Sequence, residues 1–303
     1  MVSSTLYPGE GQSVYATIGH IRQSESYRTE KPFEILVDTE PGQPVTNVEF
    51  GAVEDVLTRD ARHHGLGCFS LNSHGFRFLE YDCGDDLEAA ALVGPNRDLA
   101  LQAYLKRLQT LVTRELDAKT VILYDWRMRS SKPGVAVQRS PDRFQTLRPA
   151  RWVHADESGL CGRNLVREHL TEKEQKLFDE GIGRFRIINI WRPLVPVVLE
   201  KPLGLCNWAS VQSEDWETCD QVLSDRVDEA MYLKHEERHE WWWLPQQRST
   251  ELTLFVVWDS AKFREGLQAS TPHAAISLNS SNLSSEKEYR VSIEVRSIVW
   301  TAE

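Results

Sequence analysis

An imidazole and a carboxylate stand two residues apart in the segment Trp152-Val153-His154-Ala155-Asp156-Glu157-Ser158. On an extended strand, residues i and i+2 point to the same side, so His154 and Asp156 can close on one metal ion. A later histidine would complete a face of two imidazoles and one carboxylate, which holds Fe(II) and leaves coordination positions open. Oxygen and a co-substrate could then both reach the metal. The segment therefore supplies two candidate ligands for a mononuclear iron centre.

The choice of the third ligand depends on context. With 9 His and 45 acidic residues in 303, a His-x-acid pair is expected by chance. Two such pairs are present, His154-x-Asp156 and His235-x-Glu237. The later histidines that could join the first pair are His169, His235, His239 and His273. We favour His273, because it opens an apolar, strand-like piece of the chain, whereas His169 falls on an expected helix.

A second metal-like motif, His235-Glu236-Glu237-Arg238-His239, fits the H-E-x-x-H pattern. In zinc peptidases that pattern places two His one helical turn apart, with the Glu as general base. The two variable positions of a buried zinc helix should be uncharged, yet here they are Glu237 and Arg238. The flanks, Met231–Leu233 and Trp241–Leu244, read as strands. A polar hairpin tip is the preferred interpretation, and a zinc metallopeptidase is the alternative function.

A strand near the end of the chain carries charges on one face. In Tyr289-Arg290-Val291-Ser292-Ile293-Glu294-Val295-Arg296, alternation puts Arg290, Ser292, Glu294 and Arg296 on the same side. An R-x-S pair suits the distal carboxylate of 2-oxoglutarate, which a guanidinium binds bidentately. Both Arg290 and Arg296 could do this. We favour Arg290, because it pairs with Ser292 and its strand is expected to adjoin that of His273, while Glu294 could neutralise Arg296.

The elements that must position these groups are mostly strands. Helical spacing over Leu101–Leu116 and a Thr171-x-x-Glu174 capping box predict helices, and 159–170 is expected to be a third. The second half reads as a series of strands, so a helix-flanked β-barrel or double-sheet jelly roll is expected. We interpret residues 1–45 as an N-terminal arm and 46–303 as a single domain. A non-catalytic jelly-roll binding protein is a further alternative.

Five segments together resemble the fungal gibberellin-desaturase-like oxygenases, Fe(II)/2-oxoglutarate-dependent enzymes of natural-product biosynthesis. They are Tyr124–Ser130, Val153–Ser158, Asn189-Ile190-Trp191-Arg192-Pro193, Pro272–Ala275 and Arg290–Arg296. The resemblance implies a double-stranded β-helix, iron on His154, Asp156 and His273, and 2-oxoglutarate near Arg290 and Ser292. It also implies hydroxylation, desaturation or oxidative rearrangement of a small molecule, with O2 consumed. Trp126 stands where an imidazole is expected, which could reshape the pocket.

Several side chains are candidates for substrate contact. The chain has ten Trp, most of which should pack in the core. We expect Trp152 and Trp191 near the site, Trp152 because it lies two residues before His154. An anionic substrate group could meet one of three arginines, Arg127, Arg186 or Arg192.

Composition limits the partners and the location. The net charge of −10 argues against a nucleic-acid partner. Five dispersed Cys, no basic-then-apolar leader and no long apolar run predict a cytoplasmic protein that does not bind membranes. The run Trp241-Trp242-Trp243 should leave at least one ring outward on a strand, and such a patch often marks a protein contact. We therefore predict a homodimer.

Overall fold

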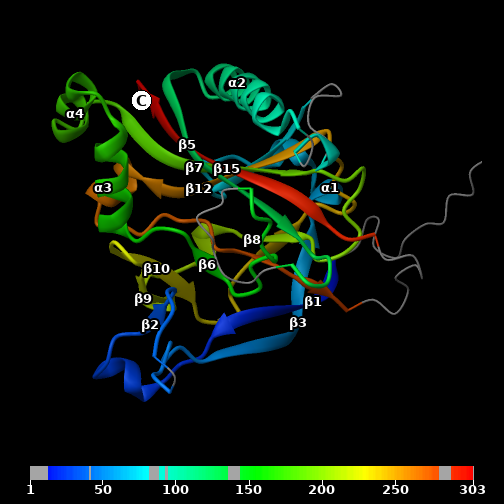
Figure 1. Cartoon of the computed structure of the whole chain (residues 1–303), viewed down its shortest axis with the longest axis vertical. Helices are drawn as coiled ribbons and strands as arrows, with labels where there is room; N and C mark the ends of the chain where they lie inside the picture. Colours follow the sequence, from blue (N-terminus) through cyan, green and yellow to red (C-terminus); the bar gives the residue numbers. More distant parts are fainter. Residues whose placement is uncertain are drawn as a thin grey trace, which may run out of the picture.

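The computed structural model describes residues 13–40, 42–81, 89–92, 95–135, 144–279 and 288–302. Within these residues the chain forms two β-sheets, one over the other, with helices outside them (Figure 1). The architecture is mainly β with flanking helices, as predicted. The first twelve residues of the expected N-terminal arm lie outside the described residues.

The strands of the ten-stranded sheet, in order across it, are β14 (Ser277–Leu278), β1 (Val14–Ile21), β3 (Phe50–Asp60), β11 (Trp241–Trp243), β8 (Leu203–Cys206), β13 (His273–Ala275), β6 (His154–Ala155), β10 (Val227–Leu233), β9 (Trp216–Val222) and β2 (Phe33–Ile35). Those of the five-stranded sheet are β4 (Phe76–Glu80), β12 (Glu251–Asp259), β7 (Arg184–Pro193), β15 (Val291–Thr301) and β5 (Ala118–Ser130). The α-helices are α1 (Ala61–His64), α2 (Arg97–Glu115), α3 (Gly159–His169), α4 (Glu172–Asp179) and α5 (Ser260–Arg264). The short 3-10 helices are Glu25–Arg28, Leu66–Cys68, Ala89–Leu92, Trp208–Ser210 and Ser213–Asp215.

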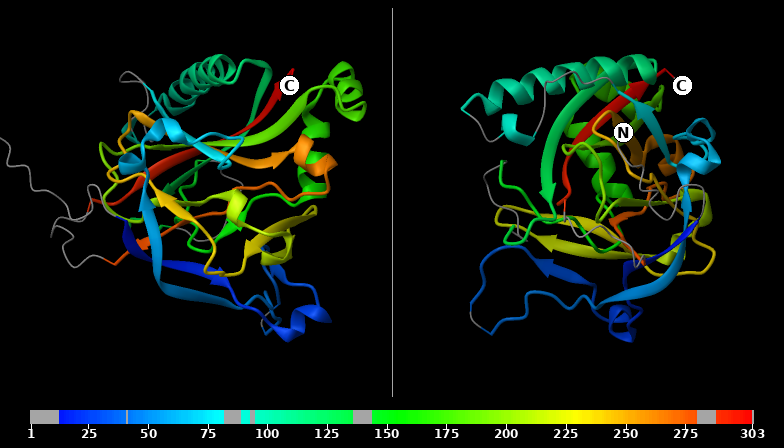
Figure 2. Two further views of the ribbon diagram at one scale, coloured as in Figure 1. Left: turned by 180° about the vertical axis from the view of Figure 1, so that it is seen from behind. Right: turned by 90° about the vertical axis from the view of Figure 1, so that its right-hand side faces the viewer.

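The five-stranded sheet is buried on both faces, and this explains its sequence. All nine residues of β12 are buried, so the strand reads as a continuous apolar run rather than an alternation. Leu254 and Val256 pack in the core under α2, whereas Phe255 and Val257 pack in the core between the sheets. Figure 2 shows α2 on the outer side of this sheet, away from β1 and β3.

The predicted helices are present. At α4 the Thr171 hydroxyl accepts from the backbone NH of Glu174, and Glu174 Oε2 accepts from the backbone NH of Thr171 at 3.0 Å, so the capping box is confirmed. At α2 the N-cap residue is Asn96, and Asp98 lies in the first turn. A carboxylate in the first turn still interacts favourably with the helix dipole.

The beginning of the described chain is part of the ten-stranded sheet. Strand β1 pairs with β3 and β14, and β2 pairs with β9. The division of the chain at residue 45 stays a prediction.

The tryptophan run in β11 is buried, which was not expected. Trp241, Trp242 and Trp243 are 0%, 6% and 7% exposed. Trp242 packs in the core between the sheets, and the other two pack in a core that also contains Ile18 and Leu233. The expected apolar surface patch is therefore wrong, because the sheet is covered on both sides here. The homodimer stays a prediction without this support.

None of the helices in the described ranges is both long enough and apolar enough to span a bilayer.

Candidate metal centre

His154, Asp156 and His273 converge at one point. His154 on β6 and His273 on β13 are directly paired across the antiparallel strands, and their ring centroids are 4.4 Å apart. Asp156 follows β6, and its Oδ1 lies 3.7 Å from His154 Nε2. One possible ligand atom from each of the three residues lies within 4.8 Å of the other two. A single cation can therefore contact all three.

Backbone carbonyls orient both imidazoles. His154 Nδ1 donates to the carbonyl of Trp152 at 2.8 Å, and His273 Nδ1 donates to that of Thr271 at 3.0 Å. A carbonyl can only accept, so each ring carries its proton on Nδ1 and keeps a lone pair on Nε2. Burial, reinforced by His273, lowers the pKa of His154 to about 4, and burial also lowers the pKa of His273. Both rings are neutral at neutral pH, as metal ligation requires.

The carboxylate of Asp156 is held by the opposite sheet. Its Oδ2 accepts from Asn189 Nδ2 on β7 at 2.7 Å, and its Oδ1 accepts from Arg296 Nη2 on β15 at 2.9 Å. Burial alone would raise the pKa of Asp156, but the Arg296 charge, with smaller contributions that include the Asn189 hydrogen bond, outweighs burial and holds this pKa below its ordinary value. Asp156 is therefore ionised, and two hydrogen bonds hold its carboxylate in place. Two neutral nitrogens and one carboxylate oxygen are a donor set that fits Fe(II).

Beside these residues lies a small cavity that Arg290 and Trp191 help to line. Arg290 is 2% exposed, its Nη1 donates to the carbonyl of Lys201, and its guanidinium lies 5.4 Å from the centre of the Trp191 ring. Within the described part of the chain, Arg290 Nε and Ser292 Oγ are buried without a hydrogen-bond partner. These unused polar groups fit the carboxylate of 2-oxoglutarate. The cavity measures about 20 Å³, close to the space of one water. Side chains that line it must move to admit the co-substrate.

Glu294 also lines this cavity. Its expected ion pair with Arg296 is present, since Arg296 Nε lies 3.8 Å from Glu294 Oε1, but Arg296 also donates a hydrogen bond to Asp156. Burial, together with the nearby Asp156 charge, raises the pKa of Glu294. The expected adjacency of the Arg290 and His273 strands is wrong, because β15 and β13 belong to different sheets.

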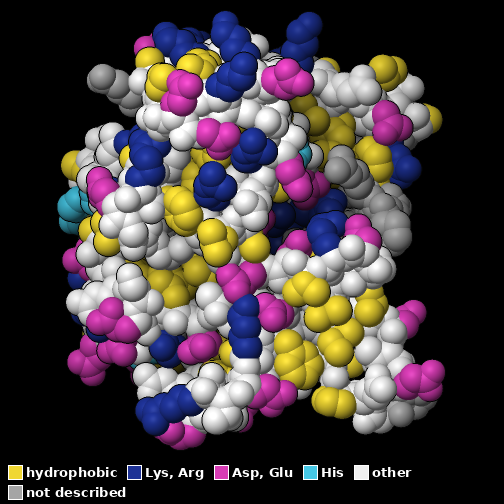
Figure 3. Space-filling view, turned by 90° about the vertical axis from the view of Figure 1, so that its left-hand side faces the viewer, with side chains coloured by type: hydrophobic (Ala, Val, Ile, Leu, Met, Phe, Trp, Pro, Cys, Tyr) yellow, Lys and Arg dark blue, Asp and Glu magenta, His cyan; other side chains and the backbone are white. Residues whose placement is uncertain are grey.

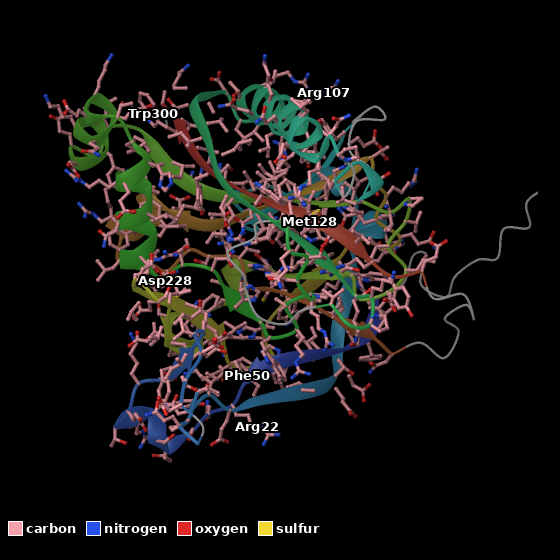
Figure 4. The ribbon with its side chains drawn as sticks, in the orientation of Figure 1. Arg22, Phe50, Arg107, Met128, Asp228 and Trp300 are labelled. Atoms are coloured by element: carbon pink, nitrogen blue, oxygen red, sulfur yellow. The ribbon has the colours of Figure 1, made fainter. Side chains whose placement is uncertain are left out.

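The two tryptophans expected near the site are there. Trp191 lines the small cavity, and Trp152 lines a second cavity of about 160 Å³ together with His154 and Asp156. Trp152 stacks on Phe50, with ring centroids 4.5 Å apart. Phe50 lies on the side of the molecule away from α2 (Figure 4). Gly19 is needed beside this ring, because a Cβ there would lie 2.4 Å from Trp152 Cε3.

Two of the arginines predicted to contact substrate face away from the metal centre. Side chains alternate along β7, so Arg186 and Arg192 point to the opposite side from Asn189 and Trp191. The Arg192 guanidinium lies 5.3 Å from the Tyr104 ring of α2, and Arg186 borders a separate pocket with residues of β4 and α2. Their assignment to the substrate site is therefore wrong, and the alternation in the sequence could have excluded it.

The third arginine and Trp126 lie on β5. Arg127 Nη1 donates to the Trp126 carbonyl at 3.2 Å and lies 3.5 Å from Asp125 Oδ1, and its contact with substrate stays a prediction. Trp126 packs under α2, with its ring 4.9 Å from that of Phe144, so it does not reshape the metal site directly. Sequence reasoning missed Arg129, which lines both cavities beside His154. It sits in the Tyr124–Ser130 motif, two residues beyond Arg127.

The H-E-x-x-H segment does not form a zinc helix. Residues 234–240 connect β10 to β11 without a helix. His239 is 6% exposed, and its Nε2 makes a hydrogen bond with Asp215 Oδ2 at 3.0 Å. The expected connection by a charged turn is confirmed, but β10 and β11 do not pair with each other, so it is not a hairpin. The geometry gives no support to a peptidase.

A family model described as "Oxidoreductase/YMDC permease-like domain" matches residues 21–300, nearly the whole chain. The chain is 28% identical to "Alpha-ketoglutarate-dependent dioxygenase phiK" of Fungal sp., over 82% of this chain and 82% of that protein. It is 27% identical to "Fe(II)/2-oxoglutarate-dependent dioxygenase nvfI" of Aspergillus novofumigatus, over 77% of this chain and 79% of the relative.

The fold has a solved counterpart. A structure titled "iron and alpha-ketoglutarate-dependent endoperoxidase NvfI with different conformation" superposes with a TM-score of 0.80 at 23% identity, covering 96% of this chain and 99% of that one. The likeness confirms the predicted double-stranded β-helix class.

These findings confirm the enzyme class predicted from the motifs: an oxidoreductase that uses Fe(II), 2-oxoglutarate and O2 on a small molecule. The chain belongs to the oxidoreductase/YMDC permease-like family, and it is similar to the fungal Fe(II)/2-oxoglutarate-dependent dioxygenases named above.

Proposed function

We propose that His154, Asp156 and His273 are the iron ligands of this oxygenase. The observation that carries the proposal is the convergence of two imidazoles and one carboxylate within 4.8 Å, with both Nδ1 atoms committed to backbone carbonyls. When bound, Fe(II) activates O2 at the expense of 2-oxoglutarate, so that a hydrogen can be removed from a substrate carbon. The protein supplies the geometry: Asn189 and Arg296 restrain the Asp156 carboxylate from the facing sheet.

Arg290 and Ser292 bind 2-oxoglutarate in this proposal. Both offer buried polar atoms that no described residue uses. Arg290 lines the cavity, and alternation along β15 puts Ser292 on the same face as Glu294, which also lines it. Arg296 is less suited, because its guanidinium already donates to Asp156. Removing Arg296 would therefore disturb the metal ligand before it disturbed the co-substrate.

The substrate occupies the cavity of about 160 Å³ that Trp152 lines, because His154 and Asp156 line this cavity and Arg290 does not. Trp152 forms an apolar wall there, and Tyr232 lies on the same cavity. Whether hydroxylation, desaturation or ring formation follows depends on which substrate carbon this wall holds next to the metal. The cytoplasmic location and the homodimer remain predictions.

The metal assignment is tested under anaerobic conditions with Fe(II) and 2-oxoglutarate. The parent protein should give the visible charge-transfer band of a chelated 2-oxoacid, and Ala at His154, Asp156 or His273 should abolish it. A matched control is His63→Ala, which removes an exposed imidazole from α1 and should leave the band unchanged. A band that survives His154→Ala and His273→Ala would contradict the assignment.

The co-substrate assignment is tested by titrating 2-oxoglutarate against the same band. Loss of a buried, charge-assisted contact costs about 2–5 kcal/mol, or roughly 30- to several-thousand-fold in affinity. Arg290→Ala should therefore weaken binding at least tens-fold, and Arg290→Lys should recover only part, since an ammonium lacks the planar fork. The control Arg186→Ala removes an arginine from the face of β7 that points away from the metal centre. An unchanged titration for Arg290→Ala would exclude Arg290 as the carboxylate partner.

A further inference from the structure

We propose that the substrate carries a carboxylate, or an equivalent anionic group, which binds in a basic pocket next to the metal centre. This basic pocket has a volume of about 500 Å³, and four cations are among the residues that line it: Lys132, Arg148, Arg151 and Lys201. Trp152 and several small residues form the rest of its wall. The inference rests on the proposed function, and it identifies the class of substrate as an acid with an apolar body.

The charge of the pocket is unusual for this protein. The chain has 45 acidic and 35 basic residues, yet none of the described residues that line the basic pocket is Asp or Glu. On the face of the molecule seen in Figure 3, by contrast, basic and acidic side chains are interspersed. Glu200 does contact the pocket wall, but its carboxylate accepts a hydrogen bond from the hydroxyl of Ser131. The local potential therefore favours an anion.

The recorded partners of these cations are neutral. Lys201 Nζ donates to Ser277 Oγ at 2.5 Å, and Arg148 Nε donates to the Val135 carbonyl at 2.9 Å. The Arg151 guanidinium lies 4.2 Å from the centre of the Trp152 ring. Among the residues with described positions, no carboxylate forms an ion pair with any of the four. An incoming anion would not have to displace an internal one.

The backbone of Lys201 has an uncommon conformation. Its φ is +48°, in the left-handed region that non-glycine residues rarely adopt. Its carbonyl accepts from Arg290 Nη1, so the turn that presents the lysine to the pocket also supports the guanidinium beside the metal. A strained backbone position that persists needs surrounding contacts to hold it, and here those contacts connect the basic pocket to the centre.

The basic pocket leads toward the metal ligands. Arg151 and Trp152 line both this pocket and the cavity of about 160 Å³, and that cavity is also lined by His154 and Asp156. A molecule whose anion lies against Arg148 and Lys201 can therefore extend past the Trp152 ring to the centre. The pocket is much larger than the cavity beside Arg290, and its apolar wall suits a carbon skeleton rather than a small inorganic anion.

The same carboxylate chemistry could come from 2-oxoglutarate, so the test separates the two acids. The probes are 1-pyrenebutyrate and its uncharged methyl ester, and their binding to the metal-free protein is measured by fluorescence in the presence of a chelator. The parent should bind the acid more tightly than the ester. The double variant Arg148→Gln/Lys201→Gln should bind the acid at least tenfold more weakly, with little change for the ester.

The control Lys106→Gln/Arg114→Gln makes the same change in charge on exposed positions of α2 and should leave both affinities unchanged. Equal affinity of the parent for acid and ester, or an equal loss in the control, would overturn the proposal. So would displacement of the acid by 2-oxoglutarate together with a tens-fold weaker 2-oxoglutarate titration in the double variant, since the pocket would then serve the co-substrate.

The result does not depend on the metal assignment. Probe binding is measured without iron, whereas the charge-transfer band reports on His154, Asp156 and His273. A normal band with no preference for the acid would reject the basic pocket and keep the metal centre. A clear preference for the acid with no band in the parent would keep the basic pocket and reject the metal centre.

Discussion

Replacement of Arg296 by Met should destabilise the metal-free protein, because it leaves the Asp156 carboxylate buried without its cation. The Arg296 side chain is only 7% exposed, and the Nη2–Oδ1 distance is 2.9 Å. At that distance the attraction is about 6 kcal/mol for an effective dielectric constant of about 20. Most of this attraction offsets the cost of burying the two charges. Breaking such a pair from one side costs about 3–5 kcal/mol, and this is the expected loss in unfolding free energy.

A double-mutant cycle separates the ion pair from lost packing. Arg296→Met, Asp156→Asn and the double variant are each unfolded in urea with a chelator present, and the transition is followed by circular dichroism. If the pair carries the effect, the double variant should be more stable than the sum of the single losses by about 2–3 kcal/mol. Losses that add to within about 0.5 kcal/mol would refute the reasoning, since Arg296 would then act through its contacts with other residues.

Three further predictions concern stability. Burial lowers the pKa of His20 from 6.5 to about 3, so between these pH values the unfolded chain takes up a proton that the folded chain does not. The contribution of His20 to the free energy of unfolding should therefore fall by about 2 kcal/mol as the pH decreases from 7.5 to 5. Urea unfolding of His20→Leu should lack this contribution, whereas the exposed-site control His63→Leu should keep it. Thr171→Ala should cost about 1 kcal/mol by loss of the capping box, measured by urea unfolding, and no change would contradict the capping role. Gly162→Ala would put a Cβ 2.4 Å from Trp258 Cδ1, so urea unfolding should show a loss of about 1–3 kcal/mol rather than the gain that alanine gives in an open helix.

The local part of the site could be predicted from the sequence, and the long-range part could not. His154 and Asp156 are two residues apart, so strand geometry alone puts both on one side. The choice of His273 depended on its setting and on the family motifs. Its direct pairing with His154 across β6 and β13 involves a separation of more than a hundred residues, and no local rule states which strands become neighbours. The same limit explains why β15 was expected beside β13 and lies in the other sheet.

Two other errors have different causes. Arg186 and Arg192 were considered as substrate contacts together with Trp191. Side chains alternate along β7, so the two arginines and Trp191 point to opposite faces, and only one of these faces can meet the metal centre. The burial of Trp241–Trp243 could not be deduced in this way. It depends on cover from both sides of β11, which is a property of how the sheets and their connections pack.

The arrangement divides the candidate centre between the two sheets. His154 and His273 lie on neighbouring strands of the ten-stranded sheet, and Asp156 follows directly after β6. The groups that restrain Asp156 lie on the five-stranded sheet, Asn189 on β7 and Arg296 on β15. The groups proposed to bind 2-oxoglutarate belong to the same sheet, with Ser292 on β15 and Arg290 just before it. The core between the sheets therefore sets the spacing between the ligands and their supports. A substitution that alters that core should change metal affinity and stability together, because the centre forms only when the two sheets pack correctly against each other.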